Sequence, residues 1–248
     1  MPQVSIHMCT YNRAHFIPQA IDSVLSQTFQ DWELLILDDQ STDNSEEVIS
    51  QYKDSRIRYI KNPENLGITK NRNKALSLST GKYVAVLDSD DYWTDNTKLA
   101  KQVDFLNSHP DYTLVGTNMT IINENGLVIK KVNYPTHNFV LKNLLLLKNF
   151  FCHSTVLYRK QVVLDLGSYD ESLPIWEDYD LWLKIGLKHK FANLDINGAN
   201  YRQHASQSNT EKKIIGQQAQ ATIINRYKNS YNGYIFAKLI DTLRNKRT

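Results

Sequence analysis

Apolar runs alternate with amphipathic segments along the first ninety residues. Continuous runs of apolar and β-branched residues, typical of strands buried on both faces, occupy residues 4–9, 32–37, 56–60 and 83–87. Segments with helical spacing of apolar positions lie between them, at residues 16–26, 45–52 and 69–78. This alternation predicts an α/β fold with a mostly parallel, doubly wound sheet in which the first and fourth strands are central.

The pattern becomes mixed after Trp93. A helix is expected over residues 97–107, followed by two strands joined by a turn at 123–126. Further helical segments are expected near residues 138–147, 160–165 and 178–188. We therefore predict a mixed second half that completes the sheet, one domain over residues 1–207, and a helical C-terminal extension over residues 208–248.

Composition and charge narrow the classes of protein. The chain has 248 residues, of which 41% are hydrophobic and 22% charged, which suits one large α/β domain. The formal net charge of +3 is uneven, because residues 211–248 hold eight Lys and Arg against Glu211 and Asp241. Residues 1–210 therefore carry −3, which makes nucleic-acid binding by this part unfavourable.

No segment has the pattern of a secretory signal or a membrane span. The start "MPQVSIHMCTYN" lacks a basic flank and an apolar core, and "FVLKNLLLLKNFF" is broken by lysines. Only Cys9 and Cys152 are present, too few for a disulfide framework. We expect a cytoplasmic protein, with any membrane contact peripheral and at the inner face of the membrane.

The basic extension has two interpretations. Its apolar positions approximate helical faces among cationic residues, first at Ile214, Ile215, Ala221, Ile224 and Tyr227, then at Tyr234, Ile235, Leu239, Ile240 and Leu243. Such helices usually pack on their own domain and leave their lysines in water. The alternative is a peripheral helix that binds anionic lipid.

Four polar clusters fall at predicted strand ends. They are "TYNR" (10–13), "DDQSTD" (38–43), "NPENLG" (62–67) and "DSDD" (88–91). Because ligands of open α/β sheets bind beyond the carboxyl ends of the strands, we expect these clusters to share one rim.

The cluster "DSDD" gathers negative charge directly after a buried strand. Two carboxylates about 5 Å apart repel by roughly 3 kcal/mol at an effective dielectric constant of 20. One interpretation is a solvated turn that caps the next helix. The other is a site for Mg²⁺ or Mn²⁺, which bind carboxylate oxygens together with substrate phosphates. The position after a buried strand favours the metal.

The remaining polar motifs each have a structural alternative. Asp43 with Glu46 resembles a capping box, which leaves Asp38 and Asp39 for ligand. Arg72 belongs to a turn and a basic helix face, but lies near the rim. The acids of "PIWEDYDLW" suit the first turn of a helix, or they face the same crevice as "DSDD". Of the histidines, His153 is typical of a packed residue and His204 of a surface residue.

The ordered set of motifs resembles the family 2 glycosyltransferases, inverting enzymes of the GT-A fold. The resemblance rests on "CTYNRAHFIPQAIDSVLSQTFQDWELLILDDQSTD", "NPENLGITKNRNKALSLSTGKYVAVLDSDD", "WEDYDLW" and "YRQHASQS". It spans roughly residues 3–208, and the order of the motifs is more specific than any one of them. It implies a nucleotide-binding half over about residues 1–95 and an acceptor half over about 96–207.

The resemblance also implies roles for individual residues. Asp178 matches the catalytic base, and Asp88 and Asp90 match the family's D-x-D motif. Donor-binding residues would be Thr10, Tyr11, Arg13, Asp39, Arg72, Asp88 and Ser89. Metal-binding candidates are Asp90, Asp91 and His204, and acceptor-side candidates are Trp176, Glu177 and His153. The implied cofactor is a divalent cation, Mn²⁺ or Mg²⁺.

The sequence departs from the family pattern in a few places. Cys9 stands where many members have Pro, and Lys74 follows "NRN" where Gly is common. The Q-x-x-R-W element and membrane helices of processive polysaccharide synthases are missing, which favours transfer of one sugar per encounter.

The predicted function is a hexosyltransferase reaction. A sugar would pass from a nucleotide-sugar to a hydroxyl of a glycan or lipid-linked acceptor, with inversion, in cell-surface polysaccharide or lipopolysaccharide synthesis. A carboxylate at Asp39 suits the N3–H of uracil, which favours UDP, although guanine also offers an N–H.

Three alternatives stay open from the sequence. A sugar nucleotidyltransferase would carry a Gly-rich basic phosphate loop, whereas "CTYNRAH" contains no glycine. A metal-dependent phosphohydrolase is supported only by the acids. A nucleotide-sugar or glycan binding module without turnover would have no need for both "DSDD" and "WED".

Overall fold

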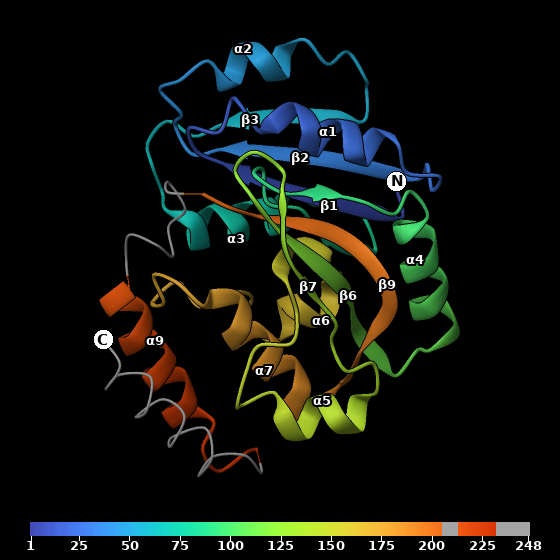
Figure 1. Cartoon of the computed structure of the whole chain (residues 1–248), viewed down its shortest axis with the longest axis vertical. Helices are drawn as coiled ribbons and strands as arrows, with labels where there is room; N and C mark the ends of the chain where they lie inside the picture. Colours follow the sequence, from blue (N-terminus) through green and yellow to red (C-terminus); the bar gives the residue numbers. More distant parts are fainter. Residues whose placement is uncertain (205–212, 232–248) are drawn as a thin grey trace.

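A mixed sheet runs through residues 1–204 and 213–231, which are the residues that the computed structural model describes (Figure 1). Its nine strands within these residues are β1 (Val4–Thr10), β2 (Trp32–Asp38), β3 (Ile57–Lys61), β4 (Tyr83–Val86), β5 (Tyr92–Trp93), β6 (Tyr112–Asn123), β7 (Val128–Val132), β8 (Leu157–Arg159) and β9 (Lys190–Gln203). Their order is β3-β2-β1-β4-β8-β6-β9-β5, and β7 pairs with β6 outside this path.

Helices connect and cover the strands. They are α1 (Ile17–Leu25), α2 (Ser45–Ser50), α3 (Ile68–Leu78), α4 (Lys98–Ser108), α5 (Asn138–Leu144), α6 (Lys160–Asp165), α7 (Glu177–Lys188) and α9 (Lys213–Arg226), with a short 3₁₀ helix, η1, at His153–Thr155. The GT-A-like, doubly wound arrangement expected from the sequence is confirmed.

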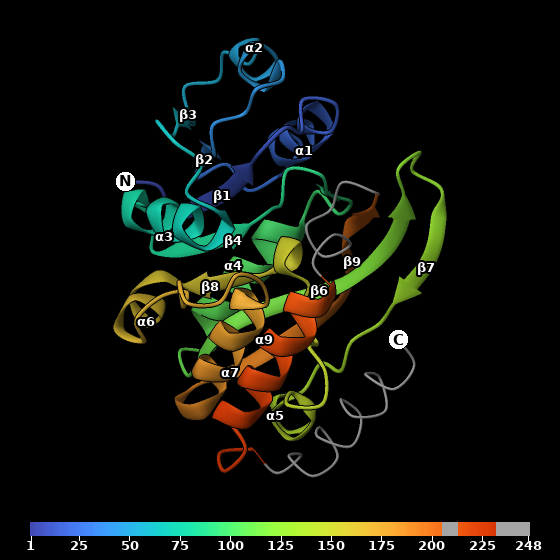
Figure 2. The same ribbon diagram turned by 90° about the vertical axis from the view of Figure 1, so that its left-hand side faces the viewer.

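The first half is parallel, as predicted. Strand β1 pairs in parallel with β2 and with β4, and β2 pairs in parallel with β3. Alternate residues of β2 enter different cores: Leu34 and Ile36 pack in the cluster with α1, and Leu35 and Leu37 in the cluster with α3. Figure 2 shows α1 and α3 on opposite sides of these strands. Burial on both faces explains the continuous apolar runs.

The second half mixes strand directions. Strand β8 is antiparallel to β4 and to β6, whereas β6 and β9 are parallel. The sequence analysis missed β9, because "KFANLDINGANYRQ" has few β-branched residues and no regular alternation. A Cβ at Gly198 would lie 2.1 Å from the Thr117 hydroxyl oxygen, so the glycine permits close approach of the two strands.

The described part of the extension packs on the domain. In α9 and the turn after it, Ala219, Ile223, Ile224, Tyr227 and Tyr231 are buried in the core cluster that contains α7. The predicted apolar face was wrong at Ile215 and Ala221, which are exposed, because the helix turns the side of Gly216 and Ala219 inward. The predicted second segment, from Tyr234 to Leu243, lies outside the described residues.

Within residues 1–204 and 213–231, no helix combines the length and apolar character needed to cross a bilayer.

Candidate active site at the strand ends

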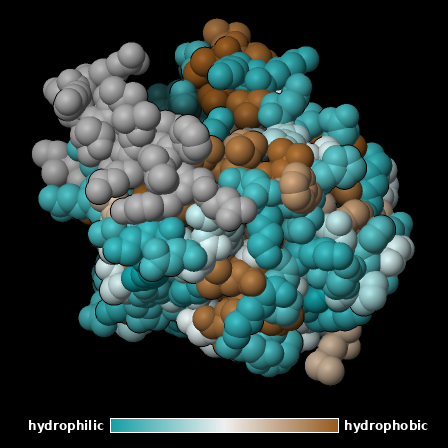
Figure 3. Space-filling view, turned by 90° about the horizontal axis from the view of Figure 1, so that it is seen from below, coloured by the Kyte–Doolittle hydropathy of each residue, from teal (hydrophilic) through white to brown (hydrophobic). Residues whose placement is uncertain are grey.

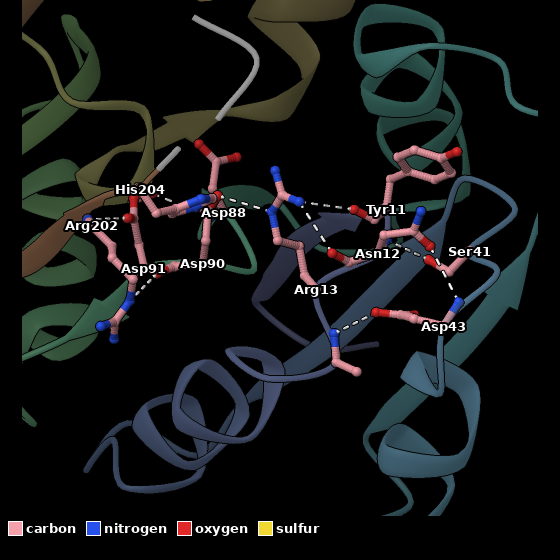
Figure 4. A network of polar contacts seen from close by, with 12 residues as sticks. Tyr11, Asn12, Arg13, Ser41, Asp43, Asp88, Asp90, Asp91, Arg202 and His204 are labelled. Carbon is pink, nitrogen blue, oxygen red and sulfur yellow. Dashed lines mark hydrogen bonds and ion pairs between the residues drawn. The ribbon is translucent and has the colours of Figure 1, made fainter. Parts of the chain in front are cut away.

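The polar clusters at the ends of β1, β2 and β4 meet at one rim (Figure 4). The side-chain oxygen of Asn12 accepts a hydrogen bond from the Thr42 amide at 2.8 Å, and the Asp43 carboxylate accepts one from the Ala14 amide at 3.0 Å. Arg13 reaches across the rim, with its Nε 3.3 Å from Oδ2 of Asp90. Loops that follow three different strands are thereby fastened to one another.

Asp43 accepts a hydrogen bond from the first residue of α2, as predicted for a cap, but it does not form a capping box. Its Oδ1 accepts the Ser45 amide at 3.0 Å, although the N-cap position is Asn44. Glu46 pairs with Lys61 at 2.8 Å instead of reaching back to the cap. The carboxylate of Asp43 thus secures both the start of α2 and the loop after β1.

Asp39 holds the loop that precedes α3. Its Oδ1 accepts hydrogen bonds from Asn62 Nδ2 and the Leu66 amide, both at 2.8 Å, and its Oδ2 accepts the Gly67 amide at 2.9 Å. An ionised carboxylate has about four acceptor positions, so one position on Oδ2 is left for a ligand. The neighbouring Asp38 is fully buried, and each of its oxygens accepts one hydrogen bond, from the Ser41 amide and from the Tyr59 hydroxyl.

Thr10 ends β1 directly beside Asp39. Its carbonyl oxygen accepts the Asp39 amide at 2.9 Å. Its hydroxyl oxygen is buried and has no hydrogen-bond partner within the described residues. A buried hydroxyl without a partner is costly, so a ligand that supplies one would be favoured here.

The three aspartates of residues 88–91 have different partners. Asp88 accepts from Arg72 Nη2 at 2.9 Å and lies 3.4 Å from Nδ1 of His153. Asp91 is buried and accepts from the Ser154 hydroxyl on one oxygen and from the Arg202 amide on the other. Asp90 keeps a partly exposed carboxylate at the rim.

These partners set the charge of the acids. Burial raises the pKa of Asp88, but the charges and hydrogen bonds of Arg72 and His153 together outweigh it and hold the pKa well below its ordinary value. Burial raises the pKa of Asp91, and the negative charges of Asp90 and Asp88 raise it further. The turn thus contains one firmly ionised acid and one acid that favours its proton.

Arg72 joins this turn to the first turn of α7. One guanidinium nitrogen contacts the Glu177 carboxylate, and the other is 2.9 Å from Asp88. Burial lowers the pKa of Arg72, but the two carboxylates raise it above its ordinary value, so the side chain stays charged. The predicted meeting of Glu177 with the crevice of "DSDD" is therefore observed.

Asp178 stands beside Glu177 with a half-buried side chain and a 3.3 Å contact from Asn149 Nδ2 to its Oδ2. The preceding Trp176 has a left-handed backbone, with φ of 65°. This conformation costs a non-glycine residue roughly 1–2 kcal/mol. It turns the chain sharply into α7, so that the acids lie at the helix N-terminus.

The two histidines lie on different sides of the acidic turn. His153 is buried in η1, between Asp88 and the Tyr169 hydroxyl, which is 3.1 Å from its Nε2. His204 is also buried, so the expectation of a surface residue was wrong. Its ring packs 5.0 Å from that of Phe16, and its Nε2 is 3.0 Å from Oδ2 of Asp90.

Within the described residues, no group of three or more His, Cys, Asp or Glu side chains is arranged to hold a metal ion. Asp90 and His204 nevertheless fit as a pair of ligands. Two neighbouring ligands of an octahedral ion with bonds of about 2.1 Å are about 3 Å apart, which matches their 3.0 Å separation. Asp91 is buried, and each of its oxygens accepts one hydrogen bond, from Ser154 and from Arg202, which suits a supporting position.

The other predicted donor residues are less engaged. Tyr11 is exposed at the rim, and Ser89 is buried within the acidic turn. Arg202 was missed by the sequence analysis, although it lies in the motif "YRQH" two residues before His204. Its Nε donates to the Asp90 carbonyl oxygen at 3.0 Å, and its amide donates to Asp91.

Comparisons with known proteins identify relatives of this chain. The family described as Glycosyl transferase family 2 matches residues 5–167. The chain is 34% identical over 247 residues to the UDP-Glc:alpha-D-GlcNAc-diphosphoundecaprenol beta-1,3-glucosyltransferase WfaP of Escherichia coli, covering 95% of each chain. It is 39% identical over 184 residues to WfgD of Escherichia coli, a glucosyltransferase of the same name, covering 73% of this chain and 69% of that one.

Two solved structures share the fold. S. aureus TarS 1-349 in complex with UDP-GlcNAc superposes with a TM-score of 0.73 at 21% identity, over 96% of this chain and 70% of TarS. The mannosyltransferase PcManGT from Pyrobaculum calidifontis, in complex with GDP-Man and Mn²⁺, gives a TM-score of 0.71 at 17% identity, over 96% and 69% of the two chains.

Proposed function

The chain belongs to glycosyl transferase family 2, whose members act on nucleotide sugars, and on that premise we propose that it transfers one sugar from a UDP-sugar to a hydroxyl of a lipid-linked or glycan acceptor, with inversion. The observation that carries the proposal is the bridge through Arg72. It joins the acidic turn after β4 to the acids of α7, although Arg72 and Glu177 are 105 positions apart. A donor-binding element and a candidate base thereby face one space.

The proposed donor site lies in the half over about residues 1–95. The vacant acceptor position of Asp39 suits the N3–H of uracil, and cytosine would place an acceptor there instead. The hydroxyl of Thr10 would gain the partner that it lacks within the described chain. Arg13 lies where its guanidinium can face a diphosphate. These features favour UDP.

A divalent cation, Mn²⁺ or Mg²⁺, would be held by Asp90 and His204 together with donor phosphates. When bound, it supplies positive charge to the departing diphosphate. Asp88 and Asp91 have their own partners and would shape the turn around Asp90. Arg13 shares the Oδ2 atom of Asp90, so its guanidinium would shift toward the diphosphate when the cation binds.

Asp178 is the proposed general base. Its carboxylate, half-buried and contacted by the Asn149 side chain, would take the proton from the acceptor hydroxyl. Glu177 is committed to Arg72, and this ion pair would fix the start of α7. Attack from the face opposite the diphosphate inverts the anomeric carbon. Holding donor and acceptor in line contributes several kcal/mol of its own, of the order expected for proximity.

The acceptor half would comprise about residues 96–207, with Trp176 and His153 as further acceptor-side candidates. Named relatives act on a diphosphoundecaprenol-linked sugar, which supports a lipid-linked acceptor and a role in cell-surface polysaccharide synthesis. We propose a site of action at the cytoplasmic membrane face, with peripheral contact to anionic lipid.

The test is thermal unfolding of the protein with UDP-sugars and GDP-sugars, each with and without Mn²⁺. A true donor stabilises the folded state by mass action, by about 2.7 kcal/mol at 100 times its dissociation constant. We expect stabilisation by a UDP-sugar, enhanced by Mn²⁺, and release of UDP when a lipid-linked acceptor is added. Stabilisation by GDP-sugars alone would overturn the choice of uracil as the nucleobase. Binding of a donor without any release of UDP would favour a binding module.

A further inference from the structure

The hairpin formed by β6 and β7 projects from the body of the molecule (Figure 2). Its turn is well built: the Asn123 amide donates to the Leu127 carbonyl oxygen, the Leu127 amide donates to Oδ1 of Asn123, both at 2.9 Å, and Gly126 takes a left-handed φ of 83°. The turn is therefore a defined structural element and not a loose loop.

Three consecutive apolar side chains follow the exposed polar turn at residues 124–126, and we call these three residues, Leu127–Ile129, the tip. Leu127, Val128 and Ile129 have relative exposures of 67%, 63% and 55%. Successive strand residues point to opposite faces, so the tip is apolar on both sides. Docking on a folded protein would need one apolar face, whereas entry into an apolar medium needs both. In Figure 3 the part that projects at the top of the view carries a broad brown area.

Two lysines follow the apolar tip. Lys130 and Lys131 are exposed, and as neighbours in β7 they also point to opposite faces. A strand rises about 3.4 Å per residue, so the three apolar residues extend about 10 Å from the lysines toward the turn. Interfacial elements enter the boundary between headgroups and acyl chains by a similar depth, about 5–10 Å. The lysines would then lie at the level of anionic headgroups.

Lysines on an edge strand also disfavour pairing with the edge of a second copy. The same two side chains thus favour anionic lipid over self-association. Within the described residues, β7 pairs with β6 and leaves its outer edge uncovered.

The hairpin is tied directly to the proposed site. Arg202 donates from Nη1 to the Glu124 carbonyl oxygen at 2.8 Å and from Nε to the Asp90 carbonyl oxygen at 3.0 Å. At the same end of the sheet, Asn123 pairs with Gln203, the residue before His204. The orientation of the tip therefore fixes the orientation of the acidic turn.

We propose that the β6–β7 hairpin inserts its tip, Leu127–Ile129, into an anionic membrane surface, with Lys130 and Lys131 as a basic collar. This places the site at the level where a lipid-linked acceptor presents its sugar, and in that respect it rests on the proposed function. The lipid contact itself is independent of turnover and can be measured without an acceptor.

The direct test uses the full chain and vesicles of phosphatidylcholine with or without phosphatidylglycerol. A Leu127→Trp variant should show a blue shift of its fluorescence on anionic vesicles, with quenching by lipids brominated near the headgroup end of the acyl chains. The triple change Leu127→Ser, Val128→Ser and Ile129→Ser should lower the vesicle partition coefficient by at least about tenfold. Lys130→Glu with Lys131→Glu should lower it by about fivefold per lost lysine, and added salt should lessen that difference.

Matched controls lie elsewhere on the surface. Phe139→Ser removes an exposed apolar side chain of α5, and Lys142→Glu with Lys188→Glu reverses two exposed lysines away from the hairpin. These changes should leave tip insertion and the effect of the serine variant unaltered. All variants should keep the unfolding temperature of the unmodified chain, because the altered side chains make few contacts.

The outcomes separate the two proposals. Vesicle binding that is unchanged in the triple serine variant, or absent in the unmodified chain, overturns the hairpin proposal. So does a dimer that the hairpin variants convert to a monomer in the absence of vesicles. A UDP-sugar that stabilises the protein would still support the proposed function in each of these cases. Insertion of the tip without any stabilisation by nucleotide sugars would instead contradict the proposed function alone.

Discussion

Two acidic segments face each other across the site, the turn at residues 88–91 and the first turn of α7, and they are held differently. In the turn, Asp88 and Asp91 accept hydrogen bonds from Arg72, Ser154 and Arg202. In α7, Glu177 contacts Arg72, while the Asn149 side chain lies 3.3 Å from the Asp178 carboxylate. The turn is fixed from several directions, whereas Glu177 is held through Arg72, and a further acid of this helix start, Asp180, is held by Arg226 and Tyr227.

The difference separates acids that build the site from acids available for chemistry. Asp88 and Glu177 share Arg72 and are each committed to it. Asp90 and Asp178 have other partners: Asp90 contacts Arg13 and His204 at the rim, and Asp178 is contacted by Asn149. A buried charge is tolerated only when it is paired. Asp88 and Glu177 therefore stabilise the buried charge of Arg72, and Arg72 in turn holds in place the two segments that carry Asp90 and Asp178.

The largest effect is expected for Asp178→Asn. The change removes the proposed base and nearly preserves shape, so transfer to an acceptor should fall by about 10² to 10⁴-fold while UDP binding stays unchanged. Steady-state release of UDP and calorimetric binding measure the two quantities. Glu171→Gln, an exposed acid outside the site, is the control. Near-normal turnover of Asp178→Asn would contradict the assignment.

Arg72→Met tests the bridge between the segments. Without the guanidinium, Glu177 and Asp88 are left without their shared cation, which typically costs about 3–5 kcal/mol. Urea unfolding should show this loss, and adding Glu177→Gln to the same chain should recover part of it, because contacting residues are not additive. A loss below about 1 kcal/mol would mean that the two segments are held together by other contacts.

Asp90→Ala sharpens the distinction within the turn. If Asp90 holds the cation, donor affinity should fall by about 10 to 100-fold in Mn²⁺ and much less without metal. Asp91→Asn is the matched variant, and it should lower the unfolding temperature without changing the effect of Mn²⁺. Equal weakening of donor binding with and without Mn²⁺ would mean that Asp90 only stabilises the turn, as proposed for Asp91.

Lys98 provides a buried cation to set against Arg72. It is fully buried in α4, donates to the Gln102 side chain at 2.8 Å, and lies 4.0 Å from the ring centroid of Trp93. Burial lowers its pKa from the ordinary 10.5 to about 7. A charged form without a carboxylate partner is thus disfavoured in the folded state.

The sign of the pH effect follows. Between pH 7 and 10.5 the unfolded chain binds the proton of Lys98 more strongly than the folded one. Stability should therefore rise with pH across this window, by up to about 1.4 kcal/mol per unit, and be lost as pH falls toward 7. Lys98→Met should remove this slope in thermal unfolding, whereas the exposed Lys101→Met should retain it. An unchanged slope in Lys98→Met would contradict the proton assignment.

The elements of the first half could be predicted because their signals are local. Apolar runs and helical spacing identified β1 to β4 and the helices between them, and the rule for strand ends brought Asn12, Asp39 and Asp90 to one rim. Strand β9 has no such signal. Its pairing with β6 depends on partners far along the chain, and on the missing side chain of Gly198 beside Thr117.

The partners of the acids could not be predicted for the same reason. The sequence places Arg72 near the rim, but not between Asp88 and Glu177, since that contact spans 105 positions. Nor does it distinguish Asp90 from Asp91, whose different burial depends on Ser154 and Arg202. The roles of Asp178, Asp90 and His204 stay predictions that the variants above test.

The parallel pairing of β6 with β9 also has a consequence for synthesis of the chain on the ribosome. Asn118 of β6 bonds Asp195 of β9 across 77 positions, so the edge of β6 that will receive β9 stays open while those residues are translated. An open edge is prone to pair with other chains, and contacts of such long range form slowly. Arg202 lies near the C-terminal end of β9 and His204 directly after it, so the loops that follow β1 and β2 leave the ribosome long before the residues that complete the acidic centre.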